Sequence, residues 1–513
     1  MKTLHTDVAV IGAGTAGMSA YRAALEQTPH VVVIEDGPYG TTCARVGCMP
    51  SKLLIAAAEA AHTITTAARF GVSGGALQVD GRAVMARVRS ERDRFVGFVL
   101  EAVQAWPEGH RLRGRARFMD NQRLRIDDHT ELQAERIVIA TGSRPAVPTA
   151  WKAALGDRLI VNDDVFDWQD LPASVAVMGT GVIGLELAQA LHRLGVRVRL
   201  YGRGARVGPL TDPALQQLSR EVMSRELPLT THARHIEVHR DGDSVVVRAT
   251  GERGSGPDGQ TLGAGPEGRT PATGPEGLTT GSGPERGLVT EERFDWLLAA
   301  TGRRPNVDGL GLEHTTLPLD PGGIPVYDRR TGQIGNSSVF IAGDVADDRP
   351  LLHEAADEGR IAGGNAGRFP DVRVRPRRAP LAVVFSDPQI MLAGASHADL
   401  VAAGTVFETG AVSFEDQGRS RVMGRNQGAL HVYGERGSGR FLGAEMIGPA
   451  AEHIGHLLAW SAQRGDSVQQ MLDSPFYHPV IEEGLRTALR HLQRNLRMGP
   501  VPVEHCLDCG PGA

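Results

Sequence analysis

The stretch Asp7-Val8-Ala9-Val10-Ile11-Gly12-Ala13-Gly14-Thr15-Ala16-Gly17 sets the architecture of this chain. It reads as a short apolar strand that runs directly into Gly-x-Gly-x-x-Gly, followed by a helical stretch from Met18 to Gln27 and a second apolar strand that ends at Glu35. Glycines at this spacing let the backbone approach a pyrophosphate at the helix N-terminus, and the carboxylate accepts hydrogen bonds from an adenosine ribose. The stretch predicts a dinucleotide-binding unit whose ligand contacts are Gly12, Gly14, Gly17 and Glu35.

A pair of cysteines lies downstream, in Thr42-Cys43-Ala44-Arg45-Val46-Gly47-Cys48-Met49-Pro50-Ser51-Lys52. Pro50 suits the first turn of a helix and residues 52–58 read as its apolar body, so Cys48 is expected at the helix N-terminus. Unpaired backbone N–H groups there favour a thiolate over a thiol. Cys43 is close enough to form a small disulfide with it. A zinc half-site or a static disulfide is the alternative, but zinc needs a second ligand pair, so we predict a redox-active pair and no metal site.

A second fingerprint follows the strand Ser174-Val175-Ala176-Val177-Met178. Its glycines are Gly179, Gly181 and Gly184. Two dinucleotide folds imply two dinucleotides, one of which donates hydride to the other. The next strand ends in Tyr201-Gly202-Arg203 without a ribose-binding acid, and Arg203 and Arg206 stand there instead. This favours NADP(H), whose 2′-phosphate an arginine accommodates, although both arginines are also explained as solvated loop charges.

Together these motifs resemble the class I flavoprotein (pyridine nucleotide–disulfide) oxidoreductases, and among them dihydrolipoyl dehydrogenase most of all. The resemblance covers nearly the whole chain. It implies FAD on the first fingerprint and NAD(P)(H) on the second, with electrons passing through FAD to the Cys43–Cys48 disulfide. It implies that Cys48 contacts the flavin and that Cys43 exchanges with the substrate. Lys52 and Glu186 resemble a pair that flanks the flavin in this family, unless each is a surface helix charge.

Further cofactor contacts follow from the same resemblance. Ala140-Thr141-Gly142 and Ala300-Thr301-Gly302 resemble crossovers between the two nucleotide domains, which assigns Thr141 and Gly142 to FAD and Gly302 to the nicotinamide nucleotide. Gly343 and Asp344 follow an apolar strand, and in the family this aspartate contacts the FAD ribityl chain, while a helix N-cap is the alternative. A helix from about Leu351 to Ala366 resembles the one beside the flavin.

The segment Phe476-Tyr477-His478-Pro479-Val480-Ile481-Glu482-Glu483 resembles the family's His-Pro motif. Thiol–disulfide exchange must remove and return protons near neutral pH, where histidine titrates. His478 is therefore the expected general acid–base and Glu483 its orienting carboxylate, in preference to Glu482. A core or solvent-facing histidine is the alternative. In the family this histidine serves the other subunit, so the resemblance implies a homodimer.

The length of 513 residues is too great for one core. We predict an α/β fold with two Rossmann-like dinucleotide-binding domains, for FAD and NAD(P), and a C-terminal α+β dimerisation domain. The expected divisions are residues 1–150 for the FAD domain with the dithiol, 151–300 for the NAD(P) domain, 301–379 for a central FAD-binding segment, 380–498 for the interface domain and 499–513 for a flexible tail.

Residues 250–290 differ in composition from the rest of the chain. A Gly-Pro pair recurs every nine residues, at 256, 265, 274 and 283, among glycines and threonines with almost no apolar residues. Such a segment cannot bury a core, so we expect a disordered insertion in the NAD(P) domain without chemistry of its own.

Composition excludes several partners and locations. A net charge of −5 offers no basic patch for nucleic acid, and no apolar run is long enough to span a membrane. The first strand begins within about seven residues of the start, which leaves no room for a secretory signal. A cytoplasmic location is therefore expected, where a cysteine pair of this kind is catalytic.

The resemblance implies a small disulfide or dithiol substrate, most of all a lipoyl group, free or on a carrier protein. Val182 in the second fingerprint and His353-Glu354-Ala355 before the flavin helix look similar to lipoyl enzymes, whereas Arg203 is unlike those that use NAD. The alternative is an NADPH-dependent reductase of another disulfide, or of a quinone or metal acceptor. A non-enzymatic scaffold has no need of the cysteine pair together with His478 and Glu483.

The C-terminal pair Cys506 and Cys509 forms a Cys-x-x-Cys beside the chain end. Mercuric reductases and large thioredoxin reductases also end in a mobile dithiol, so a second relay to the partner subunit is a hypothesis for this chain. A frayed tail or an adventitious metal pair is the simpler interpretation. The presence of His478 argues against the mercuric reductase branch.

Overall fold

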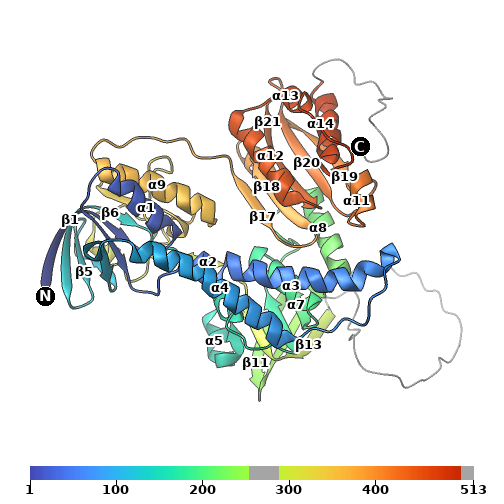
Figure 1. Cartoon of the computed structure of the whole chain (residues 1–513), viewed down its shortest axis with the longest axis horizontal. Helices are drawn as coiled ribbons and strands as arrows, with labels where there is room; N and C mark the ends of the chain where they lie inside the picture. The colour runs from blue at the N-terminus through green and yellow to red at the C-terminus, as the bar shows by residue number, and fades with distance from the viewer. Residues whose placement is uncertain (254–287, 498–513) are drawn as a thin grey trace, which may run out of the picture.

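The chain builds three β-sheets with covering helices, in a computed structural model that describes residues 1–253 and 288–497. Figure 1 shows the first sheet at one end of the molecule, the second sheet below the centre and the third above it. Helices α3 (Cys48–Thr66) and α4 (Gly81–Gln104) run across the middle (Figure 1). The architecture confirms the predicted α/β class with a C-terminal α+β unit.

The first sheet is a parallel Rossmann-like core with an antiparallel extension. The apolar strands β1 (Lys2–Ile11), β2 (Val31–Glu35) and β6 (Thr130–Ile139) lie in parallel at its centre, in the order β3-β2-β1-β6-β5-β4. The remaining strands are β3 (Arg111–Arg113), β4 (Ala116–Phe118) and β5 (Arg123–Ile126). β16 (Val339–Ile341) pairs with β6, so the chain returns to this sheet after it has built the second one.

Helices α1 (Thr15–Leu25) and α9 (Leu352–Arg368) pack directly against each other beside this sheet. Glycines on α9 make the close approach possible, because an added Cβ at Gly359 would lie 2.1 Å from the carbonyl oxygen of Ala16. At Gly363 it would lie 2.2 Å from that of Ala20. The flavin helix that the sequence predicted is therefore held against the helix of the first glycine motif.

The second sheet has the order β13-β12-β11-β10-β9-β14-β8. Its strands are β8 (Leu159–Ile160), β9 (Ser174–Met178), β10 (Arg197–Tyr201), β11 (Leu229–Asp241), β12 (Ser244–Arg253), β13 (Leu288–Phe294) and β14 (Trp296–Ala299), and its main helices are α7 (Val182–Arg193) and α8 (Pro213–Glu226). The predicted insertion 250–290 is wrong at both ends, because Gly251 pairs with Leu288 in a β12–β13 ladder that continues the sheet. The repeats themselves lie outside the described residues.

The third sheet is antiparallel, in the order β17-β18-β21-β20-β19. It comprises β17 (Leu381–Val384), β18 (Gln389–Gly394), β19 (Phe407–Ser413), β20 (Ala429–Glu435) and β21 (Phe441–Gly448), covered by α12 (Ala451–Arg464) and α14 (Glu482–Leu496). The short helices of the molecule are α2 (Thr42–Val46), α5 (Thr149–Leu155), α6 (Asn162–Val165), α10 (His397–Ala402), α11 (Gly418–Val422) and α13 (Val468–Leu472). The divisions expected at residues 150, 300, 379 and 498 stay predictions.

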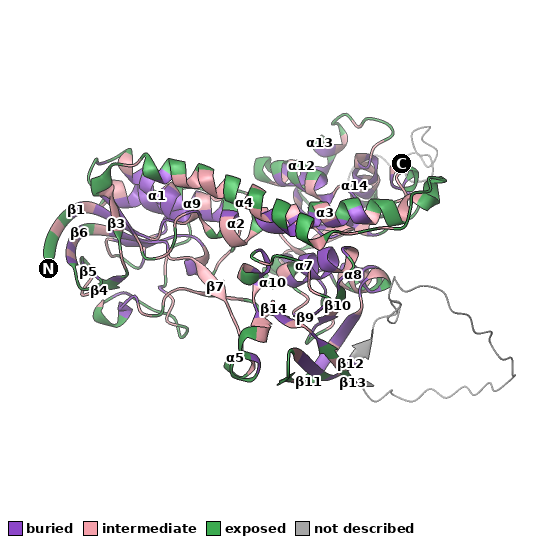
Figure 2. Cartoon of the chain, turned by 60° about the horizontal axis from the view of Figure 1, so that its bottom comes forward, coloured by how far each residue is buried: buried purple, intermediate pink, exposed green. Residues whose placement is uncertain are grey.

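Two features join the three parts. β7 (Ser143–Pro145) and β15 (Arg303–Pro305) pair in antiparallel fashion, so the two Thr-Gly crossovers lie side by side. One buried apolar cluster takes Leu54 from α3, Leu185 from α7 and Ile390 from β18. Figure 2 shows α3 with buried and exposed residues in alternation, and α4 mostly with intermediate and exposed ones. The helix that begins at Cys48 is thus packed against a helix of the second sheet and a strand of the third. In the described part of the chain, no helix is both long and apolar enough to cross a membrane.

Candidate active site

The two cysteines sit on consecutive helices that meet at a glycine. Cys43 lies in α2, and α3 begins at Cys48, as the sequence predicted. An added Cβ at Gly47 would lie 3.0 Å from the carbonyl oxygen of Thr42 and 3.2 Å from the Cα of Cys43, so a side chain there would push the helix ends apart. Both cysteines are free thiols, Cys43 half-buried and Cys48 exposed.

The two thiols differ in their affinity for a proton. A hydrogen bond donated by the Cys43 thiol, assisted by the charge of Lys52 and opposed by burial, lowers the pKa of Cys48 to about 7. The same hydrogen bond and burial raise the pKa of Cys43 well above its ordinary value. Near neutral pH the reduced pair therefore carries a thiolate at Cys48 and keeps a proton on Cys43.

Lys52 is held one helical turn beyond Cys48 by partners from the other two sheets. Its Nζ lies 3.0 and 2.8 Å from the two carboxylate oxygens of Glu186 on α7. Glu186 itself is only 4% exposed. The backbone N–H of Phe385 donates to the same carboxylate at 2.9 Å, and Lys52 Nζ lies 4.8 Å from the centre of the Phe385 ring. The Lys52–Glu186 pair is thus a partly buried contact between α3 and α7 and not two surface charges.

Two adjoining cavities surround this pair and the first glycine loop. The cysteine cavity, of about 460 Å³, has as lining residues Cys43, Cys48, Lys52, Glu186, Gly343 and Asp344. The glutamate cavity, of about 520 Å³, has as lining residues Gly12, Gly14, Glu35, Thr141 and Gly142. Gly14 and Gly142 line both, so the two cavities form one extended depression.

The residues around this depression fit FAD. An added Cβ at Gly14 or Gly142 would meet nothing within 4 Å, so each glycine leaves space for a ligand. The Glu35 carboxylate accepts hydrogen bonds from the backbone N–H groups of Ala13 (2.7 Å) and Gly37 (2.8 Å), which fixes it in the glutamate cavity, whose lining does not include the cysteines. Its position suits an adenosine ribose, while the reactive ring of a dinucleotide would lie at the cysteine end.

Gly17 does not line either cavity. An added Cβ there would lie 1.8 Å from the carbonyl oxygen of Gly12, so this glycine lets α1 pack under the loop. Gly184 does the same in the second domain, at 1.8 Å from the carbonyl oxygen of Gly179. Both were predicted as cofactor contacts, and the structure gives them a packing role in the loop that holds the ligand.

Asp344 meets partners that sequence reasoning missed. The Ser143 hydroxyl donates to its carboxylate at 2.8 Å, and Arg303 donates to the Ser143 hydroxyl at 2.8 Å and to its carbonyl oxygen at 2.7 Å. Ser143 and Arg303 each follow one of the two Thr-Gly crossovers, which was the signal available in the sequence. The Phe385 contact to Glu186 had no such signal.

The second glycine loop opens into the arginine cavity, of about 1560 Å³. Its lining includes Gly179, Gly181, Gly302, Arg203, Arg206 and Arg234. An added Cβ at Gly181 would meet nothing within 4 Å, which leaves space at the N-terminus of α7 as Gly14 does at α1. The cavity therefore fits a second dinucleotide, and it contains both arginines that the sequence singled out.

Gly202 occupies the position at which a ribose-binding acid would be expected. In the first sheet Ile11 pairs with Ile34, one residue before Glu35, and in the second Met178 pairs with Tyr201, one residue before Gly202. An added Cβ at Gly202 would lie 2.7 Å from Cγ2 of Thr180, whose hydroxyl is fixed by a 2.7 Å hydrogen bond to the Arg206 carbonyl oxygen. A side chain at position 202 would therefore require Thr180 to move, and the chain has a glycine where NAD-binding domains place a carboxylate.

His478 and Glu483 form the predicted pair but lie away from the cysteines of their own chain. His478 Nδ1 is 2.9 and 3.0 Å from the two carboxylate oxygens of Glu483. The histidine side chain is 77% exposed, whereas that of Glu483 is 5% exposed and also accepts from the backbone N–H of Val480 at 3.2 Å. Neither residue lines the cysteine cavity. The ring therefore projects from the interface domain with its tautomer set by a buried carboxylate.

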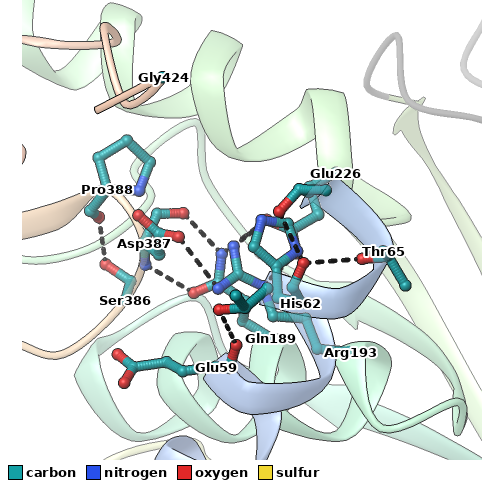
Figure 3. A network of polar contacts seen from close by, with 12 residues as sticks. Glu59, His62, Thr65, Gln189, Arg193, Glu226, Ser386, Asp387, Pro388 and Gly424 are labelled. Carbon is teal, nitrogen blue, oxygen red and sulfur yellow. Dashed lines mark hydrogen bonds and ion pairs between the residues drawn. The ribbon is translucent and has the colours of Figure 1, made fainter. Parts of the chain in front are cut away.

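A second polar network, shown in Figure 3, continues the face of α7 that carries Glu186. Arg193 lies 2.5 Å from Glu226 at the end of α8 and 3.1 Å from Asp387 in the β17–β18 turn. Gln189 donates to the Asp387 carbonyl oxygen and accepts from its backbone N–H, both at 2.8 Å. Burial and the Arg193 charge lower the pKa of His62 on α3. The network ties α7 to the turn whose Phe385 contacts Lys52 and Glu186.

The C-terminal pair Cys506 and Cys509 lies outside the described residues. The hypothesis of a second dithiol relay therefore stays a prediction from the sequence.

The family model described as pyridine nucleotide-disulphide oxidoreductase matches residues 6–359, and the dimerisation domain of the same group matches residues 381–489. The chain belongs to the pyridine nucleotide-disulphide oxidoreductase family, as the sequence motifs predicted. Members bind FAD and NAD(P)H, and the dimerisation domain supports a homodimer.

Characterised relatives carry different names. A mercuric reductase from Streptomyces lividans is 30% identical, over 94% of this chain and 95% of its own. The mycothione reductase of Mycobacterium tuberculosis is 29% identical, over 95% of this chain and 99% of its own. The dihydrolipoyl dehydrogenase of Bacillus subtilis is 27% identical, over 94% and 97%. These identities are too close together to select one substrate.

The solved structure of LpdA from Mycobacterium tuberculosis has the same fold. Its TM-score is 0.75 at 22% sequence identity, and the match covers 95% of this chain and 99% of LpdA.

Proposed function

We propose that this protein is an FAD-dependent dithiol–disulfide oxidoreductase that passes electrons between NADP(H) and a small disulfide substrate, with the lipoyl group as the first candidate. The observation that carries the proposal is the Cys43–Cys48 pair, which opens with Lys52 and Glu186 into a cavity that fits FAD. Bound FAD supplies electron transfer between a nicotinamide nucleotide and the cysteine pair.

The cysteines have separate tasks in the exchange with substrate. Cys43 keeps its proton near neutral pH, so a base must remove it before the sulfur attacks a substrate disulfide. That attack forms a mixed disulfide between Cys43 and one substrate sulfur and releases the other as a thiolate, which takes up a proton. The Cys48 thiolate then attacks Cys43, re-forms the Cys43–Cys48 disulfide and releases the second substrate sulfur. Oxidation of a dithiol such as dihydrolipoamide follows the same steps in reverse.

We assign the proton transfers to His478 of the other subunit in a homodimer. Glu483 holds Nδ1 of this ring, so proton exchange belongs to Nε2. The ring projects from the dimerisation domain and lies apart from the cysteine cavity of its own chain, which supports a role across the dimer.

NADP(H) is the nucleotide that the arginine cavity suits better. Arg203 and Arg206 line it, and Gly202 stands where a carboxylate would repel a 2′-phosphate. A cytoplasmic location belongs to the same proposal, because reducing surroundings keep such a pair catalytic.

The test is the oxidation of NADPH and NADH by the purified flavoprotein with lipoamide as acceptor, measured side by side. We expect lipoamide-dependent turnover that is faster with NADPH at equal concentration and that Cys43→Ser abolishes. Faster turnover with NADH would show that the nucleotide assignment is wrong. Absence of turnover with both nucleotides would show that the lipoyl assignment is wrong, and the acceptors named for the relatives would then be tried.

A further inference from the structure

β11 leaves regular strand geometry where it passes the arginine cavity. Its register against β12 shifts between Thr231 and Arg234 and again between Arg234 and Glu237. His232 and His235 have φ values of 50° and 49°, a region that residues other than glycine seldom adopt. Such conformations are strained, and they concentrate where a chain holds a ligand.

The irregular segment is fixed against the loop that follows β10. The backbone N–H of Ala233 donates to the Gly202 carbonyl oxygen at 2.8 Å, and that of His232 donates to the Gly204 carbonyl oxygen at 3.2 Å. From the other side, the Thr250 hydroxyl donates to the Arg234 carbonyl oxygen at 2.9 Å. The bulge is therefore a fixed structure whose position is set by the same loop that carries Arg203 and Arg206.

The consequence is a group of basic side chains from two separate segments, the loop after β10 and the bulge of β11. Arg234 and His235 are exposed and line the arginine cavity together with Arg203 and Arg206. Among the described residues that line the arginine cavity, Asp164 on α6 is the one acidic residue. Its carboxylate accepts a hydrogen bond from the backbone N–H of Val161. A doubly charged phosphate monoester is bound best by such arginines, because each offers two parallel N–H donors.

We propose that Arg234, with His235 beside it, is a specificity-determining contact to the 2′-phosphate of NADP(H), in addition to Arg203 and Arg206. This inference rests on the NADP(H) preference proposed above. The bulge of β11 is what allows Arg234 and His235 to line the cavity together. A regular strand would alternate its side chains between the two faces of the sheet and would not present two successive basic residues to the cavity.

The experiment measures binding of 2′,5′-ADP and of 5′-AMP to the holoenzyme by calorimetry, because these two ligands share the adenosine and differ in the 2′-phosphate. We expect Arg234→Ala to weaken 2′,5′-ADP binding about tenfold or more and to leave 5′-AMP binding unchanged. The KM for NADPH rises while the KM for NADH stays the same, which also shows that the domain is folded. Arg234→Lys is expected to fall between wild type and alanine.

The matched control is Arg248→Ala, which removes an exposed arginine from the neighbouring strand β12, outside the cavity lining. It should bind both ligands as the wild type does. Wild-type affinity of Arg234→Ala for 2′,5′-ADP, together with a loss in Arg203→Ala, would overturn the role of Arg234 and leave the NADP(H) preference intact. An equal loss for both ligands would also overturn it, since the residue would then support the adenosine pocket. Equal wild-type affinity for the two ligands would overturn the nucleotide preference and this inference together.

Discussion

Cys48 and Cys43 differ in chemistry because of what each touches. We expect the pH profile of Cys48 alkylation in the reduced protein to have its midpoint near pH 7, below that of Cys43, since only the thiolate reacts. Lys52→Met raises the Cys48 midpoint, because the ammonium stabilises the thiolate. Rates at each cysteine are measured by peptide mass spectrometry after iodoacetamide treatment. As a control, Lys152→Met removes the same charge from α5 and should leave the Cys48 midpoint unchanged. An unchanged midpoint in Lys52→Met would contradict the role of Lys52 in stabilising the Cys48 thiolate.

Among the elements, α7 ties the second part of the chain to the third, because one of its faces bonds the β17–β18 turn through Glu186, Gln189 and Arg193 (Figure 3). The Arg193 side chain is 5% exposed, so Arg193→Met leaves the carboxylates of Glu226 and Asp387 without their cation. We expect the unfolding free energy to fall by about 2–4 kcal/mol. This is less than the usual loss for a fully buried ion pair, because the two carboxylates are partly exposed. Urea unfolding measures it. Arg240→Met, which breaks the exposed pair with Asp157, should cost less than about 1 kcal/mol.

At the scale of the whole molecule, the separation of His478 from the cysteine cavity predicts an active site shared between subunits. Subunits with Cys43→Ser and subunits with His478→Gln should each be nearly inactive as homodimers. Random mixing makes half of the dimers mixed, each with one intact site, so about a quarter of the wild-type activity should return. Mixing Cys43→Ser with Cys48→Ser should recover nothing, because no mixed dimer has an intact cysteine pair. A lack of recovery in verified mixed dimers of the first kind would contradict the shared site.

Short-range patterns were enough to predict the nucleotide units, the start of a helix at Cys48, the family and the α+β unit at the end. Glycine spacing, the position of Pro50 and apolar periodicity act within a few consecutive residues, so local sequence contains them. The same reasoning placed the edges of the 250–290 insertion wrongly, because composition could not show that Gly251 pairs with Leu288 in a ladder.

Contacts between distant segments came from the packing of the three sheets. The Phe385 N–H donates to Glu186, Thr180 packs close to Gly202, and the β11 bulge lines the same cavity as Arg203. These contacts join residues with no shared local pattern. Sequence spacing predicts which residue types a segment presents and on which side. Which of them meet across sheets depends on strand register and on where α3 and α7 pack, and these are properties of the folded chain as a whole.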